Sequence, residues 1–357
     1  MSIYVVIGIA AFGVLIAVHE IGHFVTAKLL GVKVNEFAIG MGPKILSKQG
    51  KETLYSLRAL PFGGFCAMEG QDEGVDDPRA FTSQKRWRRF IILIGGSAAN
   101  FIAAFIVIVI LTSGVGSFVG TTITDLLDGF PNEGEHGLMV GDTLVSINGE
   151  RLYYVDDFST FMQLARSGSV DLVIRRGGET IALDRFPLER RTFIINGEEE
   201  LRFGISFNTI NATPFEQLKY SCYQAMNFVR LIRVSLAQLI SGAVGLRDIS
   251  GPVGIVDAMN NAGQSAAAEY GFMAALRNIA FLTAFIGVNL AVMNMLPIPA
   301  LDGGRILFIF ITWAIEKVIK RRLDPKYEGY VHTGAMVLLL GFMAFVLISD
   351  VLKLFNA

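Results

Sequence analysis

An apolar run, residues 3–18, leads without a break into the sequence HEIGH at residues 19–23. On a helix, His19 and His23 lie one turn apart on the same face, so both imidazoles can bind one metal ion. Glu20 lies about 100° round the helix from His19, where its carboxylate can act on water beside the metal. The motif also occurs by chance on soluble helices. However, an ionisable group at the centre of a membrane helix costs about 2.5–3.5 kcal/mol and usually marks function. The position of HEIGH therefore predicts a metal site within a membrane helix.

Three further apolar stretches are long enough to cross a membrane as helices: residues 90–112, 278–296 and 333–352. Each has about 19–23 residues, and about 20 residues of helix cross the ~30 Å hydrocarbon core of a bilayer. The mean hydropathy of the chain, +0.50, agrees with this interpretation. Together with the first run, these stretches predict a polytopic α-helical membrane protein with four transmembrane helices.

Lysine and arginine residues set the expected orientation in the membrane. They gather at residues 85–89, before the second span, and at residues 317–326, after the third. Because short loops rich in these residues stay in the cytoplasm, both segments are expected to be cytoplasmic. The amino terminus, residues 113–277 and the carboxyl terminus are then extracytoplasmic. The two cysteines, Cys66 and Cys222, fall on opposite sides and are not expected to form a disulfide.

The extracytoplasmic region begins with a pattern of short strands and turns over residues 113–210. Residues 137–149 read GLMVGDTLVSING, in which apolar residues alternate after a Gly-Asp turn and end at an Asn-Gly hairpin signal. A helical segment and a strand pair follow, at residues 158–165, 170–175 and 180–183. This order resembles an α+β PDZ domain, which binds extended peptides by adding them to a sheet edge. A small β domain of another kind is the alternative.

A long amphipathic helix is expected next. The sequence TPFE at residues 213–216 forms a capping box with proline at the first helical position, and the helix would run to about Ile240. Charged residues interrupt its apolar face, so we expect it to lie on the outer membrane surface and not to cross it. A second, weaker helix is expected at residues 266–276. The two define a segment of extracytoplasmic surface helices, residues 211–278.

A third metal ligand is needed, because catalytic zinc usually takes three protein ligands and leaves one position for water. The candidate is Asp302, in the segment 294–304 with sequence NMLPIPALDGG, whose two prolines break the helix. At about 1.5 Å per residue, Asp302 and His19 both arrive near the inner leaflet, and Asn100 reaches a similar depth from the cytoplasmic side. An Asp-Gly turn at the membrane surface is the alternative for Asp302. The matching depths favour the ligand.

These motifs resemble those of the site-2 protease family of intramembrane zinc metalloproteases. The resemblance is closest to the bacterial branch called regulator of sigma-E protease, here with room for one PDZ domain. It covers the whole chain and rests on HEIGH at residues 19–23, GxxxN at residues 96–100 and NxxPxPxLDGG at residues 294–304. It implies a protease core in two halves, residues 1–112 and 279–357, in the bacterial inner membrane. The active site would lie near the cytoplasmic leaflet.

The resemblance also implies the residues of the site. One Zn²⁺ per chain would be bound by His19, His23 and Asp302, with Glu20 as the general base. The unwound substrate would be held by four further residues: Gly96, Asn100, Asn289 and Asn294. For each asparagine, the alternative is an ordinary hydrogen bond between helices.

A cytoplasmic β segment is expected at residues 34–68, with strands around the turn at residues 47–50. In the family, such a sheet lies beside the active site and presents an edge strand to the substrate. A loop packed over the helix ends is the alternative.

The resemblance implies single-span membrane proteins as substrates, such as anti-sigma factors already trimmed outside, and remnant signal peptides. The external part of the substrate, or a peptide, would meet the PDZ domain, and no nucleic-acid partner is expected. Two other functions stay open at this point. One is a membrane metal transporter, and the other is a membrane-anchored PDZ scaffold with an inactive site.

Overall fold

The computed structural model describes residues 2–71, 75–165, 168–195, 198–243, 245, 251–321 and 326–356. The chain divides into two compact units. The first, called the helical unit here, comprises Met1–Leu111 and Gln224–Ala357. The second, called the β unit, comprises Thr112–Tyr223.

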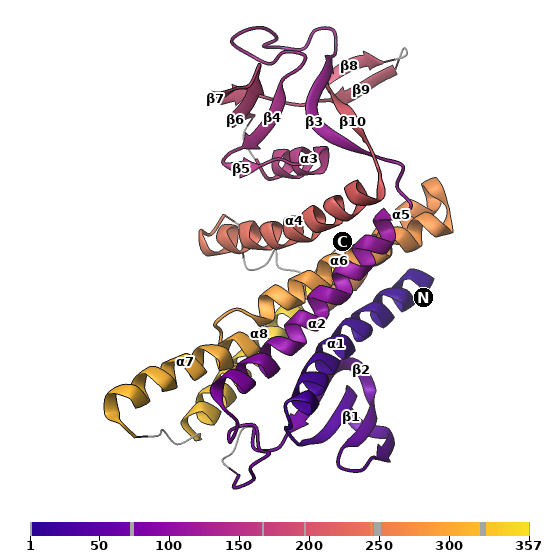
Figure 1. Ribbon diagram of the computed structural model, residues 1–357. Helices are drawn as coiled ribbons and strands as arrows, with labels where there is room; N and C mark the ends of the chain where they lie inside the picture. The colour runs from indigo at the N-terminus through magenta and orange to yellow at the C-terminus, as the bar shows by residue number, and fades with distance from the viewer. Residues whose placement is uncertain are drawn as a thin grey trace. The chain divides into compact units, whose positions relative to one another are not determined.

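The long helices are those of a membrane protein. Within the described ranges, three helices are long and apolar enough to cross a membrane: α1 (Ile3–Leu29), α2 (Arg86–Thr112) and α6 (Phe272–Asn294). The other long helices are α4 (Pro214–Ile240), α5 (Pro252–Tyr270), α7 (Asp302–Ile319) and α8 (Lys326–Asn356) (Figure 1). The fourth expected span lies inside α8, and its crossing of the membrane stays a prediction.

The boundary between α5 and α6 differs from the expected one. The sequence predicts a weak helix at residues 266–276 and a span from residue 278, whereas α5 already begins at Pro252 and α6 at Phe272. Proline suits the first turn of a helix, where its missing N–H would have no partner anyway. Gly271, with φ +85°, ends α5, because glycine adopts this left-handed conformation without a steric penalty. The expected boundary was therefore wrong.

The segment after α1 is an antiparallel hairpin of two long strands, β1 (Val34–Gln49) and β2 (Leu54–Met68). Strand β2 packs along α1 (Figure 1). At the hairpin turn, Glu52 forms ion pairs with Lys28 and Arg79. These two cations hold the pKa of Glu52 below its ordinary value. Of the strand and loop alternatives for this segment, the structure shows the strands.

Helix α2 is packed on two sides within the helical unit. Towards its amino end, Ile92 lies in an apolar cluster with Ile306 and Ile309 of α7. Towards its carboxyl end, Ile108 lies in a second cluster with Phe228 of α4. Phe228 is 2% exposed, and burial of a phenylalanine side chain contributes roughly 1.5–3 kcal/mol. The first cluster packs α7 against α2, and the second packs α4 against α2.

The β unit is built around a six-stranded antiparallel sheet with the order β10-β3-β4-β6-β7, in which β5 pairs with β4. Its strands are β3 (Ser117–Leu126), β4 (Thr143–Ile147), β5 (Glu150–Arg151), β6 (Ser169–Arg176), β7 (Glu179–Pro187) and β10 (Ile205–Asn211). Helix α3 (Val155–Leu164) lies against β3 and β4 (Figure 1). A separate hairpin, β8 (Arg191–Ile195) with β9 (Glu198–Arg202), was not expected from the sequence.

Two turn residues and a buried ion pair account for the course of the chain around β4. Asn148 and Gly149 both have positive φ, 49° and 80°, as a two-residue hairpin turn between β4 and β5 requires. Asp142, 1% exposed, accepts two hydrogen bonds of 2.8 and 2.7 Å from the guanidinium of Arg176 in β6. The order of strands and helix is the one expected, and the assignment as a PDZ domain stays a prediction.

Candidate metal centre

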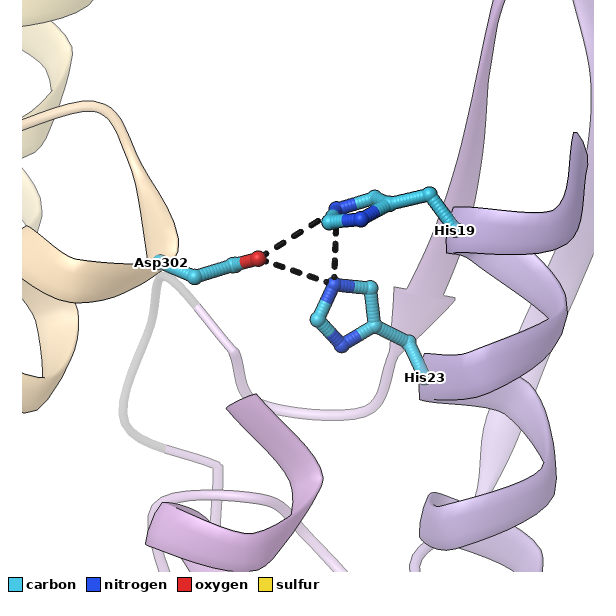
Figure 2. Close-up of side chains that lie close together, drawn as sticks. All are labelled: His19, His23 and Asp302. Atoms are coloured by element: carbon cyan, nitrogen blue, oxygen red, sulfur yellow. Dashed lines mark hydrogen bonds and ion pairs between the residues drawn. The ribbon is translucent and has the colours of Figure 1, made fainter. Parts of the chain in front are cut away.

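Two histidines of α1 and the first residue of α7 converge on one point. His23 Nε2 lies 3.2 Å from His19 Nε2 and 3.1 Å from Asp302 Oδ2. His19 Nε2 lies 3.3 Å from the same carboxylate oxygen. The three side chains are 8–17% exposed. Figure 2 shows both imidazoles facing the carboxylate across a small gap.

The spacing of these three donors fits a tetrahedral zinc ion. With bonds of about 2.0–2.1 Å, a tetrahedral ion holds its donors about 3.3 Å apart. The measured separations, 3.1–3.3 Å, match this value. Two imidazoles and one carboxylate also form a usual donor set for hydrolytic zinc, with a fourth position left for water. The residues present therefore fit the metal that the sequence predicts.

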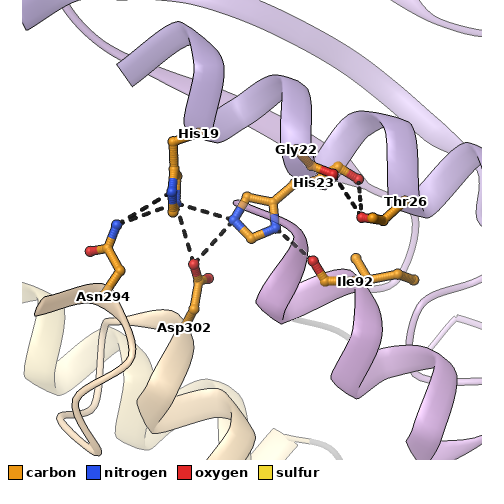
Figure 3. Close-up of polar contacts among 7 residues, drawn as sticks. All are labelled: His19, Gly22, His23, Thr26, Ile92, Asn294 and Asp302. Atoms are coloured by element: carbon orange, nitrogen blue, oxygen red, sulfur yellow. Dashed lines mark hydrogen bonds and ion pairs between the residues drawn. The ribbon is translucent and has the colours of Figure 1, made fainter. Parts of the chain in front are cut away.

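A main-chain bond orients the buried ligand. The Nδ1–H of His23 donates to the carbonyl oxygen of Ile92 in α2 at 2.9 Å, which leaves Nε2 with a free lone pair for the metal (Figure 3). Such an outer hydrogen bond fixes the tautomer and the ring orientation of a metal-binding histidine. Because Ile92 is an apolar residue acting through its backbone, the sequence offers no signal for this contact.

The chain between α6 and α7 places Asp302 by folding back tightly on itself. A Cβ atom on Gly303 would lie 2.3 Å from the carbonyl oxygens of Met295 and Leu296, so only glycine fits there. Ala300 adopts φ +82° just before α7. The Gly-Gly pair after Asp302 is thus needed for the return of the chain, and the two prolines prevent α6 from continuing.

Glycines of α2 let the histidine-bearing face of α1 approach closely. A Cβ atom on Gly22 would lie 2.2 Å from the carbonyl oxygen of Gly95. A Cβ atom on Gly96 would lie 2.4 Å from His23 Nε2 and 2.7 Å from His19 Cε1. The structure therefore gives Gly96 a steric role, because it makes room for both imidazoles.

Glu20 lies beside the three donors and is backed by strand β2. Its carboxylate interacts electrostatically with both histidines and with Asp302, and the main-chain amide of Cys66 donates to it. A Cβ atom on Gly64 would lie 3.1 Å from Glu20 Cγ, so the strand passes directly behind this side chain. The resemblance implies a sheet beside the active site, but the contact of β2 with Glu20 was not expected from the sequence. Its signal is Gly64, whose lack of a side chain allows the close approach.

The three asparagines occupy different places. The Nδ2 of Asn294 lies 3.4 Å from His19 Nε2, at the metal centre (Figure 3). Asn100 is fully buried in α2, one turn after Gly96. Asn289 is half-buried on α6, and no hydrogen bond from it to the three donors is found among the described residues. Five residues of helix turn by about 140° beyond one full turn, so Asn289 and Asn294 face different sides of α6.

Fold and site together define a metal-dependent hydrolase of membrane-protein type. The chain matches the sequence model of peptidase family M50 over residues 7–342. It belongs to this family, the site-2 protease family, and is a zinc metalloprotease of that type. The family and the enzyme class expected from the motifs are confirmed.

Curated relatives agree over nearly the full length of the chain. A protein of Clostridium acetobutylicum named "putative zinc metalloprotease" is 37% identical over 353 residues, covering 99% of this chain and 98% of that protein. A protein of Clostridium perfringens with the same description is 33% identical over 351 residues, 98% of each chain. The regulator of sigma-W protease RasP of Bacillus subtilis is 26% identical over 428 residues, covering 97% of this chain and 98% of RasP.

Proposed function

We propose that this metalloprotease cuts inside the membrane, within the transmembrane segments of single-span membrane proteins. One observation carries the proposal: the metal-binding histidines lie inside α1, a helix apolar enough to cross the bilayer. His19 lies about 24 Å along the helix axis from Ile3, which is most of the depth of a hydrocarbon core. A zinc site at this depth is reached by peptide bonds that are themselves in the membrane.

We assign the reaction to four side chains: His19, His23 and Asp302 hold the zinc ion, and Glu20 is the general base. Zinc, when bound, lowers the pKa of water and polarises the scissile carbonyl. Glu20 takes the proton from the water and returns it to the leaving amine nitrogen as the C–N bond breaks. The contacts of Glu20 with β2 support this assignment, because they hold the side chain beside the three proposed metal ligands.

The substrate must be unwound before its carbonyl reaches the metal, because a helix keeps its carbonyls hydrogen-bonded. Asn294 lies at the metal centre and can pair with the exposed backbone through its amide. We place Asn100 in the same role. The hairpin β1–β2 offers apolar side chains that are more than 40% exposed, Ile39, Leu46 and Leu57, beside which an extended segment can lie.

We further propose that the β unit is an extracytoplasmic PDZ domain that excludes substrates with bulky external parts. In this topology α8 is the fourth span and both termini are extracytoplasmic. The similarity to RasP, a protease named for its control of a sigma factor, supports anti-sigma factors as the substrate class.

Cleavage of a single-span substrate by the purified protein in liposomes tests the proposed activity. We expect the wild type to cut, and Glu20→Gln and a zinc chelator each to abolish cutting. Glu69→Gln is the matched control, because Glu69 pairs with Lys33 outside the site and should leave the rate unchanged. If Glu20→Gln cut as fast as the wild type, Glu20 would not be the base. If the zinc-loaded wild type cut no trimmed substrate, the transporter and scaffold alternatives would gain support.

A further inference from the structure

Two polar side chains of α2 are buried without partners. Asn100 is 0% exposed and Ser97, one turn earlier, is 4% exposed. The Oδ1 and Nδ2 atoms of Asn100 and the Oγ of Ser97 have no hydrogen-bond partner among the described residues. A buried polar atom without a partner is unfavourable, and most such atoms in folded proteins are satisfied by the protein or by an ordered water. Because these three polar atoms lie within one helical turn, a single small polar ligand could pair with all of them.

The pair lies next to the metal centre. Asn100 follows Gly96 by four residues, so both lie on the same face of α2, about 6 Å apart along the axis. Gly96 in turn makes room for the rings of His23 and His19. On the other side, Gly287 of α6 approaches the main chain of Asn100, where a Cβ atom would lie 3.6 Å from the carbonyl oxygen. The segment of α2 that carries the polar pair thus packs against α1 at Gly96 and against α6 at Asn100.

The neighbouring residues of α2 are apolar. Ile92 and Leu93 precede the pair, Ala104 and Ile108 follow it, and all four are at most 1% exposed. An apolar ligand would leave all three polar atoms unsatisfied. A water molecule needs two to four polar partners and both donates and accepts. The hydroxyl of Ser97 and the amide of Asn100 together supply two acceptor oxygens and three donor hydrogens.

We propose that Ser97 and Asn100 bind buried water, one helical turn from the metal centre, and that this water supplies the hydrolytic reaction. The proposal rests on the proposed intramembrane activity, in which each cut peptide bond consumes one water molecule at a site surrounded by apolar helices. In this proposal Ser97 binds water. Asn100 also binds water until an unwound substrate reaches the Asn100 side chain.

Water-edited solid-state NMR tests the binding site directly. The zinc-loaded full-length protein, labelled with ¹⁵N-asparagine and ¹⁵N-isoleucine, is placed in liposomes, and magnetisation transfer from water to the Asn100 side-chain amide is measured. The signal is assigned by its loss in Asn100→Leu. We expect rapid transfer in the wild type and at least a two-fold slower build-up in Ser97→Ala. Thr26→Val is the matched control, because the hydroxyl of Thr26 already donates to the carbonyl of Gly22 at 2.8 Å. It should leave the transfer unchanged.

Transfer to Asn100 no faster than to the backbone amide of Ile108 would overturn the proposal, whatever Ser97→Ala does. Equal transfer in the wild type and in a folded Ser97→Ala protein would remove Ser97 from the site. The measurement does not require activity. An inactive protein with a water signal would contradict the proposed function alone, and an active protein without the signal would contradict only the water site.

Discussion

Replacement of Gly96 by alanine should damage the metal centre although Gly96 is not itself a metal ligand. The new Cβ would lie 2.4 Å from His23 Nε2 and 2.7 Å from His19 Cε1, whereas ordinary contacts of a Cβ atom are 3.4–4 Å. One ring, or the whole of α2, therefore has to move by about 1 Å. Ligand distances in a zinc site tolerate only about 0.2 Å. We expect zinc affinity to fall at least 10–100-fold, as it does when an outer contact of a ligand is lost.

Zinc affinity is measured by competition with a chromophoric chelator on the purified protein in detergent. Cleavage of a single-span substrate at saturating zinc gives a second value. There we expect a loss of about 10²-fold, the typical cost of a 1 Å misplacement. Gly8→Ala in α1 is the control, because its Cβ would meet Met259 at an ordinary 3.6 Å. Wild-type zinc affinity in a folded Gly96→Ala protein would refute the steric role of Gly96.

Three further predictions concern residues outside the metal ligands. Gly64→Ala should lower kcat several-fold while zinc affinity stays unchanged, because the new Cβ presses on Glu20 and not on a metal ligand. Cleavage kinetics measure kcat, and chelator competition measures zinc affinity. A change in KM alone would contradict this prediction. Asp142→Asn should lower the unfolding free energy of the β unit by about 3 kcal/mol, because it breaks the buried ion pair with Arg176. Chemical denaturation measures this change, and a decrease of less than about 1 kcal/mol would contradict the prediction. The lowered pKa of Glu52 means that its stabilisation is complete above the unfolded value of about 4.3 and is lost as pH falls through the folded value. Hydrogen exchange of the hairpin should therefore accelerate below about pH 4, and the acceleration should be weaker in Glu52→Gln.

Helix periodicity made it possible to predict the metal centre from the sequence. The two histidines of HEIGH share a helix face by their spacing alone, and the depth of Asp302 follows from the rise per residue. The structure brings these three side chains together, with Asn294 beside them. Local patterns also predicted the turn at Asn148 and Gly149, because a two-residue hairpin demands positive φ at both positions.

Contacts between distant segments could not be predicted from the sequence in the same way. The bond from His23 to the backbone of Ile92 depends on tertiary packing, which no local pattern records. The approach of β2 to Glu20 depends on the same packing, and its one signal in the sequence is Gly64. Asn289 was implied by the resemblance, and the 3.6-residue period places it on a different side of α6 from Asn294, so its role in holding the substrate stays a prediction. The start of α6 was placed too late because hydropathy marks the apolar part of a helix and not its cap at Gly271.

The position of the cut tests the central claim most directly. The purified, zinc-loaded protein is incubated in liposomes with a trimmed single-span substrate, and the masses of both products identify the broken bond. Our account predicts a cut inside the apolar segment of the substrate, absent in Glu20→Gln. A Glu20-dependent cut in the part of the substrate outside the membrane would contradict an intramembrane active site. The assignment as a zinc metalloprotease would still hold.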